Sequence, residues 1–131
     1  MKNTFKKAER LTSKNILDDI FKEGKTIKKF PFIVKHLPCK FEDDEKLKVV
    51  ISVPKRRIKN AVNRNRIRRL IKEAYRLNKA NLKIVLEKYE KGLALFFIYT
   101  GKENPDYATI EMKIKLLLNE LIRIYDKNNE I

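Results

Sequence analysis

The sequence predicts an α+β protein, an α/β sandwich in which helices cover a small mixed sheet. Segments whose apolar residues recur at helical spacing alternate with segments of period two, which is typical of such a layered fold. An unbroken apolar run at residues 93–99, bounded by Gly92 and Gly101, indicates a strand covered on both faces. At 131 residues, with three Gly and four Pro, the chain fits one domain, residues 1–131, without a flexible linker. The expected order is α-β-β-α-β-α, with room for a further short strand at residues 26–29.

The first helix is predicted in the segment TSKNILDDIFKEGK, residues 12–25. Ser13 or Thr12 can cap its start, and Gly24 can end it. Its apolar stripe consists of Ile16, Leu17, Ile20 and Phe21. Asp18 and Asp19 are adjacent, so on a helix they point about 100° apart and cannot grip one metal ion together.

Two strands are expected next. In KFPFIVKHL, residues 29–37, Phe30, Phe32 and Val34 alternate with Ile33 and Lys35. Pro31 indicates either an edge strand or the first residues of a strand. Residues 38–46 form a loop whose acidic run, residues 42–45, reads as a solvated hairpin loop rather than a cation site. In LKVVISV, the next strand, one face carries Leu47, Val49, Ile51 and Val53.

Two longer helices complete the pattern. One begins at Asn60, a favourable N-cap, and its apolar face is Ile67, Leu70, Ile71 and Ala74. Residues 81–91 either continue this helix or form a second short one that ends at Gly92. After the apolar strand, Asp106 caps a last helix whose stripe is Ile110, Ile114, Leu117, Leu121 and Tyr125.

Positive charge is concentrated in the middle of the chain. The formal net charge is +15, and residues 53–76 carry ten cations against one acid, Glu73. These cations are Lys55, Arg56, Arg57, Lys59, Arg64, Arg66, Arg68, Arg69, Lys72 and Arg76. A focused excess of this size indicates a polyanionic partner, with nucleic acid favoured over a membrane surface or a merely solvated basic face.

The helix that begins at Asn60 can both pack and bind. At about 100° per residue, its apolar residues share one sector, while Asn65, Arg69, Lys72 and Arg76 lie opposite. Arg64 and Arg68 fall on one flank and Arg66 on the other. Arginine outnumbers lysine on this segment, which favours bidentate phosphate contacts. Charge alone does not choose between DNA and RNA.

Nothing in the sequence predicts catalysis by the protein itself. There is no Ser/His/Asp arrangement, no Cys/His pair at ligand spacing and no Gly-rich phosphate loop. Cys39 is interpreted as an incidental half-buried thiol and His36 as a structural residue. The first ten residues lack the apolar core of a signal peptide, and no apolar run is long enough to span a bilayer, so a cytoplasmic protein is expected.

The block VVISVPKRRIKNAVNRNRIRRLIKEAYR resembles the protein subunit of bacterial ribonuclease P. The family pattern is a strand, a basic loop and a helix that carries NAV, RNR, RR and a final I-x-E-A. Here these letters are residues 60–62, 64–66, 68–69 and 71–74. RLTSKNILDDIFKEGK and FPFIV resemble the first helix and early strand of the family, so that nearly the whole chain is covered.

This resemblance implies an α-β-β-β-α-β-α sandwich, similar to the second domain of a small-subunit ribosomal protein, with a left-handed βαβ crossover. It implies a subunit of an endoribonuclease that binds a large catalytic RNA and assists removal of the 5′ leader from precursor tRNA. The RNA, with Mg²⁺ bound mainly by that RNA, would carry the catalysis. DNA and membranes are not expected partners. The alternative is a non-enzymatic RNA-binding module of the ribosomal-protein or RNA-chaperone type.

The resemblance also implies two sets of contact residues. Those facing the catalytic RNA are Lys55, Arg56, Arg64, Asn65, Arg66, Arg68, Arg69 and Lys72. Those facing the leader, between the first helix and the sheet, are Leu17, Phe21, Phe32 and Lys35. Relatives often carry aromatic residues at the positions of Leu17 and Lys35. Phe21 and Phe32 are either stacking platforms or core residues.

Overall fold

The computed structural model of the protein describes residues 5–127 and confirms the predicted α+β architecture. Its elements are η1 (Lys7–Glu9), a short 3₁₀ turn, α1 (Lys14–Glu23), β1 (Lys25–Lys29), β2 (Phe32–Cys39), β3 (Leu47–Ser52), α2 (Ala61–Asn78), α3 (Ala80–Leu86), β4 (Gly92–Tyr99) and α4 (Tyr107–Lys127). The short extra strand expected near residues 26–29 is present as β1, and residues 80–86 form a second short helix rather than a continuation of α2.

The four strands make one mixed sheet in the order β1-β2-β4-β3. β1 pairs with β2 and β2 with β4 in antiparallel fashion, whereas β3 pairs with β4 in parallel. The connection between β3 and its parallel neighbour runs through α2 and α3. The last strand in the sequence therefore occupies the interior of the sheet, bonded on both sides.

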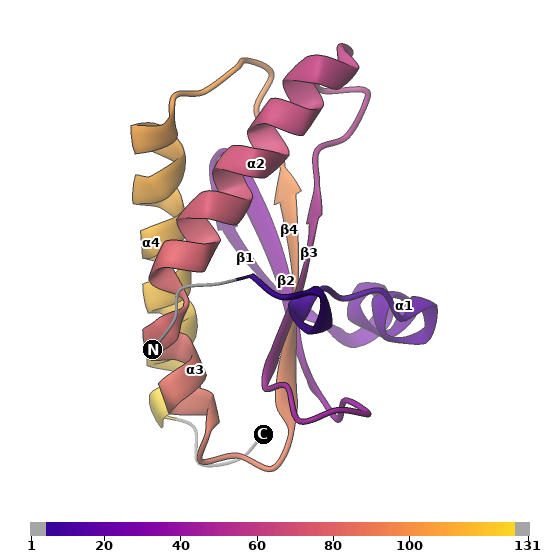
Figure 1. Ribbon diagram of the computed structural model, residues 1–131, viewed down its shortest axis with the longest axis vertical. Coiled ribbons are helices and arrows are strands. Elements are labelled where there is room, and N and C mark those ends of the chain that lie inside the picture. The colour runs from indigo at the N-terminus through magenta and orange to yellow at the C-terminus, as the bar shows by residue number, and fades with distance from the viewer. Residues whose placement is uncertain (1–4, 128–131) are drawn as a thin grey trace.

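The two faces of the sheet are covered differently. α2 and α4 lie on one side of it and α1 on the other (Figure 1). Because side chains alternate along a strand, Phe32 and Val34 of β2 and Phe97 of β4 point to the α2 and α4 side, where they join the main core. A smaller cluster around Ile20 of α1 and Ala94 of β4 fills the α1 side.

Helix ends follow the local signals. The Ser13 hydroxyl accepts a hydrogen bond from the Ile16 amide at 3.3 Å, and Gly24 follows the last residue of α1. The Asp106 carboxylate accepts one from the Thr109 amide at 2.8 Å at the start of α4. The predicted stripe of α4 is fully buried, at Ile110, Ile114, Leu117, Leu121 and Tyr125.

Two sequence-based predictions about the segment around β2 are wrong. Phe30 does not share a strand face with Phe32 and Val34, because it lies in the turn between β1 and β2 and its side chain is 73% exposed. The sequence predicts that Pro31 marks either an edge strand or the start of a strand. β2 is an interior strand and begins directly after Pro31, so this proline marks the start of a strand. Residues 40–46 are not a hairpin loop, since β2 and β3 are separated by β4.

Candidate nucleic-acid interface

α2 is held at its start by Asn60. The Asn60 side chain accepts hydrogen bonds from the amides of Val62 at 2.8 Å and Asn63 at 3.3 Å, which satisfies two of the otherwise unpaired N–H groups of the first turn. Ile67, Ile71 and Ala74 are fully buried on the helix side that faces the sheet. Burial of this apolar stripe fixes the rotation of α2 and turns its cationic residues away from the core.

The buried side of α2 is wider than its sequence indicates. Tyr75 is fully buried beside Ala74 and packs against Phe97 with ring centroids 5.9 Å apart, whereas Leu70 is only half-buried. Burial raises the pKa of the Tyr75 hydroxyl, with a smaller contribution from Glu9. Tyr75 therefore belongs to the core, not to the binding surface.

The remaining surface of the N-terminal part of α2, with the loop before it, forms what we call the basic face. Its members are the eight residues predicted for the catalytic RNA: Lys55, Arg56, Arg64, Asn65, Arg66, Arg68, Arg69 and Lys72. Lys55, Arg56, Asn65, Arg69 and Lys72 are exposed, and the other three are half-buried. The structure thus brings all eight to one connected region around the start of α2.

Neutral oxygens hold three guanidiniums of the basic face. Arg64 Nη1 donates to the carbonyls of Ile58 at 3.0 Å and Lys59 at 2.7 Å, which ties the loop to the helix. Arg68 Nη1 donates to Asn65 Oδ1 at 2.7 Å. Because a guanidinium has five N–H donors, these bonds orient each side chain and leave donors and full charge for a phosphate.

Arg66 is the third of these guanidiniums, and it points to a different neighbour. Its Nη1 donates to the carbonyl of Pro105 at 3.0 Å, 39 residues away. Pro105 precedes α4, so this bond joins α2 to the loop between β4 and α4. Arg66 is consequently both a member of the basic face and a link between two segments, a role that its spacing in the sequence did not indicate.

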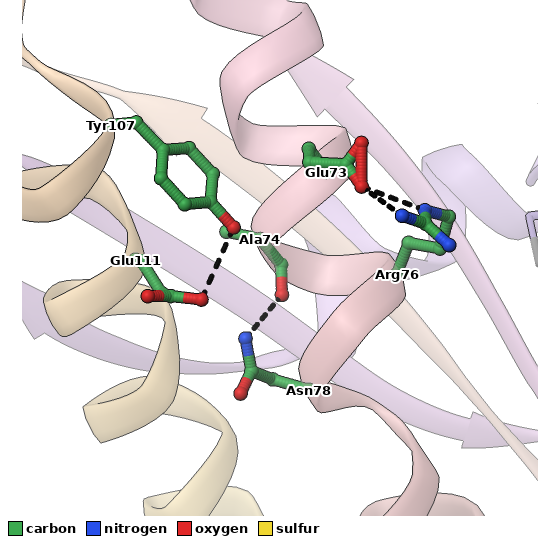
Figure 2. Close-up of polar contacts among 6 residues, drawn as sticks. All are labelled: Glu73, Ala74, Arg76, Asn78, Tyr107 and Glu111. Atoms are coloured by element: carbon green, nitrogen blue, oxygen red, sulfur yellow. Dashed lines mark hydrogen bonds and ion pairs between the residues drawn. The ribbon is translucent and has the colours of Figure 1, made fainter. Parts of the chain in front are cut away.

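The C-terminal part of α2 differs, because its cations are paired with carboxylates. Figure 2 shows Glu73 and Arg76 paired along the helix, with Asn78 donating to the Ala74 carbonyl at 2.7 Å and Tyr107 of α4 donating to Glu111 at 3.1 Å. Just beyond the helix, Lys79 forms a buried ion pair with Glu9 of the N-terminal segment.

The Glu9 carboxylate accepts hydrogen bonds from Lys79 and from the Lys6 amide. Burial alone would raise the pKa of Glu9, but the hydrogen bonds from Lys79 and from the Lys6 amide, together with the charge of Lys83, hold that pKa below its ordinary value. Lys83 Nζ lies 3.7 Å from the Glu9 carboxylate. These contacts fix the N-terminal segment against the end of α2.

The N-terminal segment borders the basic face. Phe5 lies under Lys72, with Nζ 5.7 Å from the ring centroid, and the Leu11 amide donates to the Val49 carbonyl at 2.9 Å on the edge of the sheet. A hollow of about 270 Å³ between this segment, β3 and α2 includes Arg10, Arg68 and Lys72 in its lining. Arg10 therefore extends the basic face beyond the predicted residues.

The second predicted set lies on the opposite side of the sheet, with one exception. Leu17 is half-buried on α1, and Phe21 is 55% exposed with its ring centroid 5.1 Å from that of Phe96, at an edge-on angle. Lys35 of β2 is the register partner of Phe96 and donates to Thr26 Oγ1 at 3.3 Å. Phe21, Lys35 and Phe96 thus form one patch, which we call the α1 patch.

Phe32 does not belong to this patch, and its prediction as a leader-binding residue is corrected here. Its side chain is 1% exposed and packs edge-on against Tyr99, with centroids 5.8 Å apart, on the side of the sheet covered by α2 and α4. Because side chains alternate along β2, Phe32 and Lys35 point to opposite faces. The second aromatic residue of the α1 patch is instead Phe96, which the sequence analysis did not identify.

His36 and Cys39 are structural residues, as the sequence predicts. His36 is buried with Nδ1 2.6 Å from the Tyr125 hydroxyl, and burial, reinforced by Lys25, lowers the pKa of its imidazole to about 4. Burial, followed by the charge of Asp19, raises the pKa of the half-buried Cys39 thiol to about 11. Neither group is poised as a base or nucleophile near neutral pH.

Within residues 5–127, no three His, Cys, Asp or Glu side chains are grouped so that they could hold a metal ion. The acidic run at residues 42–45 instead places Asp43 in a surface ion pair with Lys48 at 2.8 Å. No helix in that part of the chain is long and apolar enough to cross a membrane. The basic face and the α1 patch are built from cations, the Asn65 amide and aromatic rings.

Comparison with known proteins places the chain in a family. Residues 5–122 match the family model described as Ribonuclease P. The ribonuclease P protein component of Porphyromonas gingivalis is 35% identical over 118 residues, which cover 90% of this chain and 84% of that protein. The corresponding component of Clostridioides difficile is 31% identical over 115 residues, 87% of this chain and 92% of that protein. The solved structure of the RNase P protein from Thermotoga maritima is similar with a TM-score of 0.64 at 28% identity, covering 88% of this chain and 96% of that one.

Proposed function

The chain belongs to the ribonuclease P protein family, and from this membership we propose that it binds the catalytic RNA of ribonuclease P through the basic face. The observation that supports this proposal is that three arginines of the basic face are hydrogen-bonded to neutral oxygens and not to carboxylates. Arg64, Arg66 and Arg68 are oriented by neutral acceptors, so their charge is available to a polyanion. Counterion release from phosphates then supplies much of the affinity.

The α1 patch is proposed to contact the 5′ leader of precursor tRNA. Phe21 and Phe96 offer aromatic surface to an unpaired base, and Lys35 offers a cation to its phosphate. Leu17 borders the patch and supplies apolar contact without a stacking face. The patch and the basic face lie on different sides of the molecule, so one protein can hold the catalytic RNA and the leader at the same time.

In this proposal the protein positions and the RNA catalyses. Within residues 5–127, no three His, Cys, Asp or Glu side chains are grouped to hold a metal ion, so those residues do not fit a resident metal. Hydrolysis of the phosphodiester that joins the leader to the tRNA would depend on Mg²⁺ bound mainly by the RNA, and the protein's part is to hold that RNA and the leader. The reaction leaves the mature 5′ end on the tRNA. The bacterial cytoplasm is the expected compartment.

Reconstitution tests the proposal. The protein is added to a bacterial ribonuclease P RNA at low Mg²⁺, and leader removal from precursor tRNA is followed. We expect the protein to raise the cleavage rate and to lower the Mg²⁺ concentration that is required, because its cations replace part of the metal's screening role. Unchanged RNA activity would contradict the proposal, and so would site-specific cleavage by protein freed of RNA.

The α1 patch is tested by paired affinity titrations of the reconstituted enzyme. Phe21→Ala should weaken binding of precursor tRNA by about 1–3 kcal/mol and leave binding of mature tRNA unchanged, since only the precursor carries a leader. Lys35→Ala should have a smaller effect of the same kind. Phe32→Ala is the matched control: as a core truncation it should lower stability by about 3–5 kcal/mol and affect both RNAs alike. Equal losses for both RNAs with Phe21→Ala would show that the patch is structural.

A further inference from the structure

A hollow outside both proposed surfaces lies between the turn before β2, the loop before α2 and the loop between β4 and α4. Its volume is about 710 Å³, within the range of pockets that bind small molecules. Its lining includes Phe30, Arg57, Lys102, Asn104, Thr109 and Lys113.

Hydrogen bonds hold the walls of this hollow together. The Thr100 amide donates to the Pro31 carbonyl at 2.8 Å, which joins the β4–α4 loop to the turn before β2. The Tyr99 hydroxyl donates to the Glu103 carbonyl at 2.8 Å and closes the same loop on itself. Arg66 fixes the far end of the loop through Pro105. The hollow is therefore preformed, which reduces the entropic cost of binding.

The lining combines an aromatic ring with positive charge. Phe30 is 73% exposed although it is large and apolar, so it contributes little to the core. Three cations, Arg57, Lys102 and Lys113, share the lining with one acid, Glu103. Asn104 and Thr109 add groups that can both donate and accept hydrogen bonds. An aromatic platform beside cations and amide groups suits an unpaired nucleotide, whose base stacks while its phosphate meets a cation.

The hollow is continuous with the basic face. Arg57 follows Lys55 and Arg56 in the loop before α2, and Arg66 of the basic face bonds to Pro105, a lining residue. An RNA that lies along α2 meets Arg66 and Arg57 at the border of the hollow, beside the carboxylates of Glu103 and Asp106. The α1 patch belongs to the other face of the sheet, so the occupant comes from the RNA bound by α2.

We propose that this hollow binds one unpaired nucleotide of the catalytic RNA, with the base stacked on Phe30 and the phosphate held by Lys102 or Lys113. The proposal rests on the function proposed above and adds a second, aromatic contact to the electrostatic one. It makes the β4–α4 loop and the turn at Phe30 part of the RNA-binding surface.

Fluorescence tests the stacking directly, because the chain contains no Trp. A Phe30→Trp variant carries a single indole at the hollow, and stacking of a base should quench its emission when catalytic RNA is added without tRNA. Ile84→Trp, at an exposed position on α3, is the matched control and should stay unquenched. No quenching of the Phe30→Trp variant overturns the proposal. Quenching only when precursor tRNA is added also overturns it, because the nucleotide would then come from the substrate.

Affinity measurements separate stacking from charge. Phe30→Ala should lower the affinity for the catalytic RNA by about 5- to 150-fold with an unchanged salt slope, and Phe30→Tyr should retain it. Joint replacement of Lys102 and Lys113 by Ala should reduce the log–log salt slope by about 0.7 to 1.4, as one or two phosphate contacts on a single strand are lost. Lys115→Ala removes one charge from α4 outside the hollow and should leave the slope unchanged. Wild-type affinity in Phe30→Ala overturns the proposal.

The failure of this inference is distinct from failure of the proposed function. If the hollow does not bind RNA, the wild-type protein still stimulates leader removal, and Phe30→Ala has the same affinity for the catalytic RNA as the wild-type protein. If instead the protein does not bind ribonuclease P RNA, the wild-type protein itself does not stimulate leader removal. Thermal melting of each variant confirms that the exposed substitutions leave the fold intact.

Discussion

The two halves of α2 use the same residue types for opposite purposes. In the first half, Arg64 and Arg68 are oriented by carbonyl and amide oxygens. In the second half and just beyond it, Arg76 and Lys79 meet the carboxylates of Glu73 and Glu9. Cations held by neutral acceptors keep their charge for a partner, whereas cations paired with carboxylates stabilise the fold. The acceptor, rather than the count of cations, therefore marks where the binding surface ends.

The largest expected effect comes from the buried pair. Lys79→Ala leaves Glu9 buried without its principal partner and should lower the free energy of unfolding by about 3–5 kcal/mol. Lys72→Ala removes an exposed cation of the basic face and should change stability by less than about 0.5 kcal/mol. Urea unfolding of both variants measures the contrast. Similar losses in the two would contradict the distinction between cations of the basic face and cations paired with carboxylates.

Replacing cations of the basic face should affect RNA binding strongly although it affects stability little. Joint replacement of Arg68, Arg69 and Lys72 by Ala should reduce the log–log salt slope for the catalytic RNA by roughly 2 to 3, one unit or slightly less per lost phosphate contact. Stability should be nearly unchanged, because Arg69 and Lys72 are exposed and Arg68 donates to the exposed side chain of Asn65. Filter binding across a salt series supplies the slope. An unchanged slope would mean that the basic face does not contact RNA.

Acid should weaken the second half selectively. The pKa of Glu9 is lowered in the folded protein from an ordinary value of 4.5, so below that pH the unfolded chain takes up a proton before the folded one. The stability contributed by Glu9 is present above pH 4.5 and is lost as pH falls through the folded pKa, by at most about 1.4 kcal/mol per pH unit.

The measurement is the difference in unfolding free energy between wild type and Glu9→Gln across this range. Taking the difference cancels the separate contribution of His36, whose lowered pKa of about 4 makes stability fall between pH 6.5 and 4 as the unfolded chain gains its proton. A difference that stays constant below pH 4.5 would show that Glu9 does not act through its charge.

The smallest effect is expected from removing the carboxylate partner of a cation in the second half of α2, which would make that cation resemble those of the basic face. Glu73→Gln removes the exposed carboxylate that pairs with Arg76 and should cost no more than about 0.5 kcal/mol of stability. The net charge of the helix rises by one, so the salt slope for RNA should stay the same or increase by up to about 0.9. A marked loss of stability would indicate that the pair serves the fold more than surface pairs usually do.

Local features of the fold could be predicted from the sequence, because neighbours in the chain determine them. The caps at Ser13, Asn60 and Asp106 are predicted correctly, since each is satisfied within three residues. The buried stripe of α4 follows from its spacing alone. The existence of β1 was left open because its five residues carry three lysines and a weak apolar pattern.

Long-range placement could not be predicted in the same way. Alternation along β2 separates Phe32 from Lys35, but it does not reveal which of them faces α1. The family resemblance implies both as leader contacts, and the structure shows that only Lys35 lies on that side. The contacts of Glu9 with Lys79 and of Arg66 with Pro105 join residues 70 and 39 positions apart, and no local pattern records them. For the same reason the handedness of the crossover was implied by family resemblance and not by periodicity.

The interior position of β4 has a consequence for the order of events during synthesis. β4 is the partner of both β2 and β3, yet it is encoded after α2 and α3. Until residues 92–99 leave the ribosome, β1 and β2 can form only a hairpin, and β3 and the apolar side of α2 have no sheet to complete. Sheet closure is thus a late, non-local step of the kind that slows folding. Meanwhile the arginines of α2 emerge early, so the nascent chain can meet RNA before its core has formed.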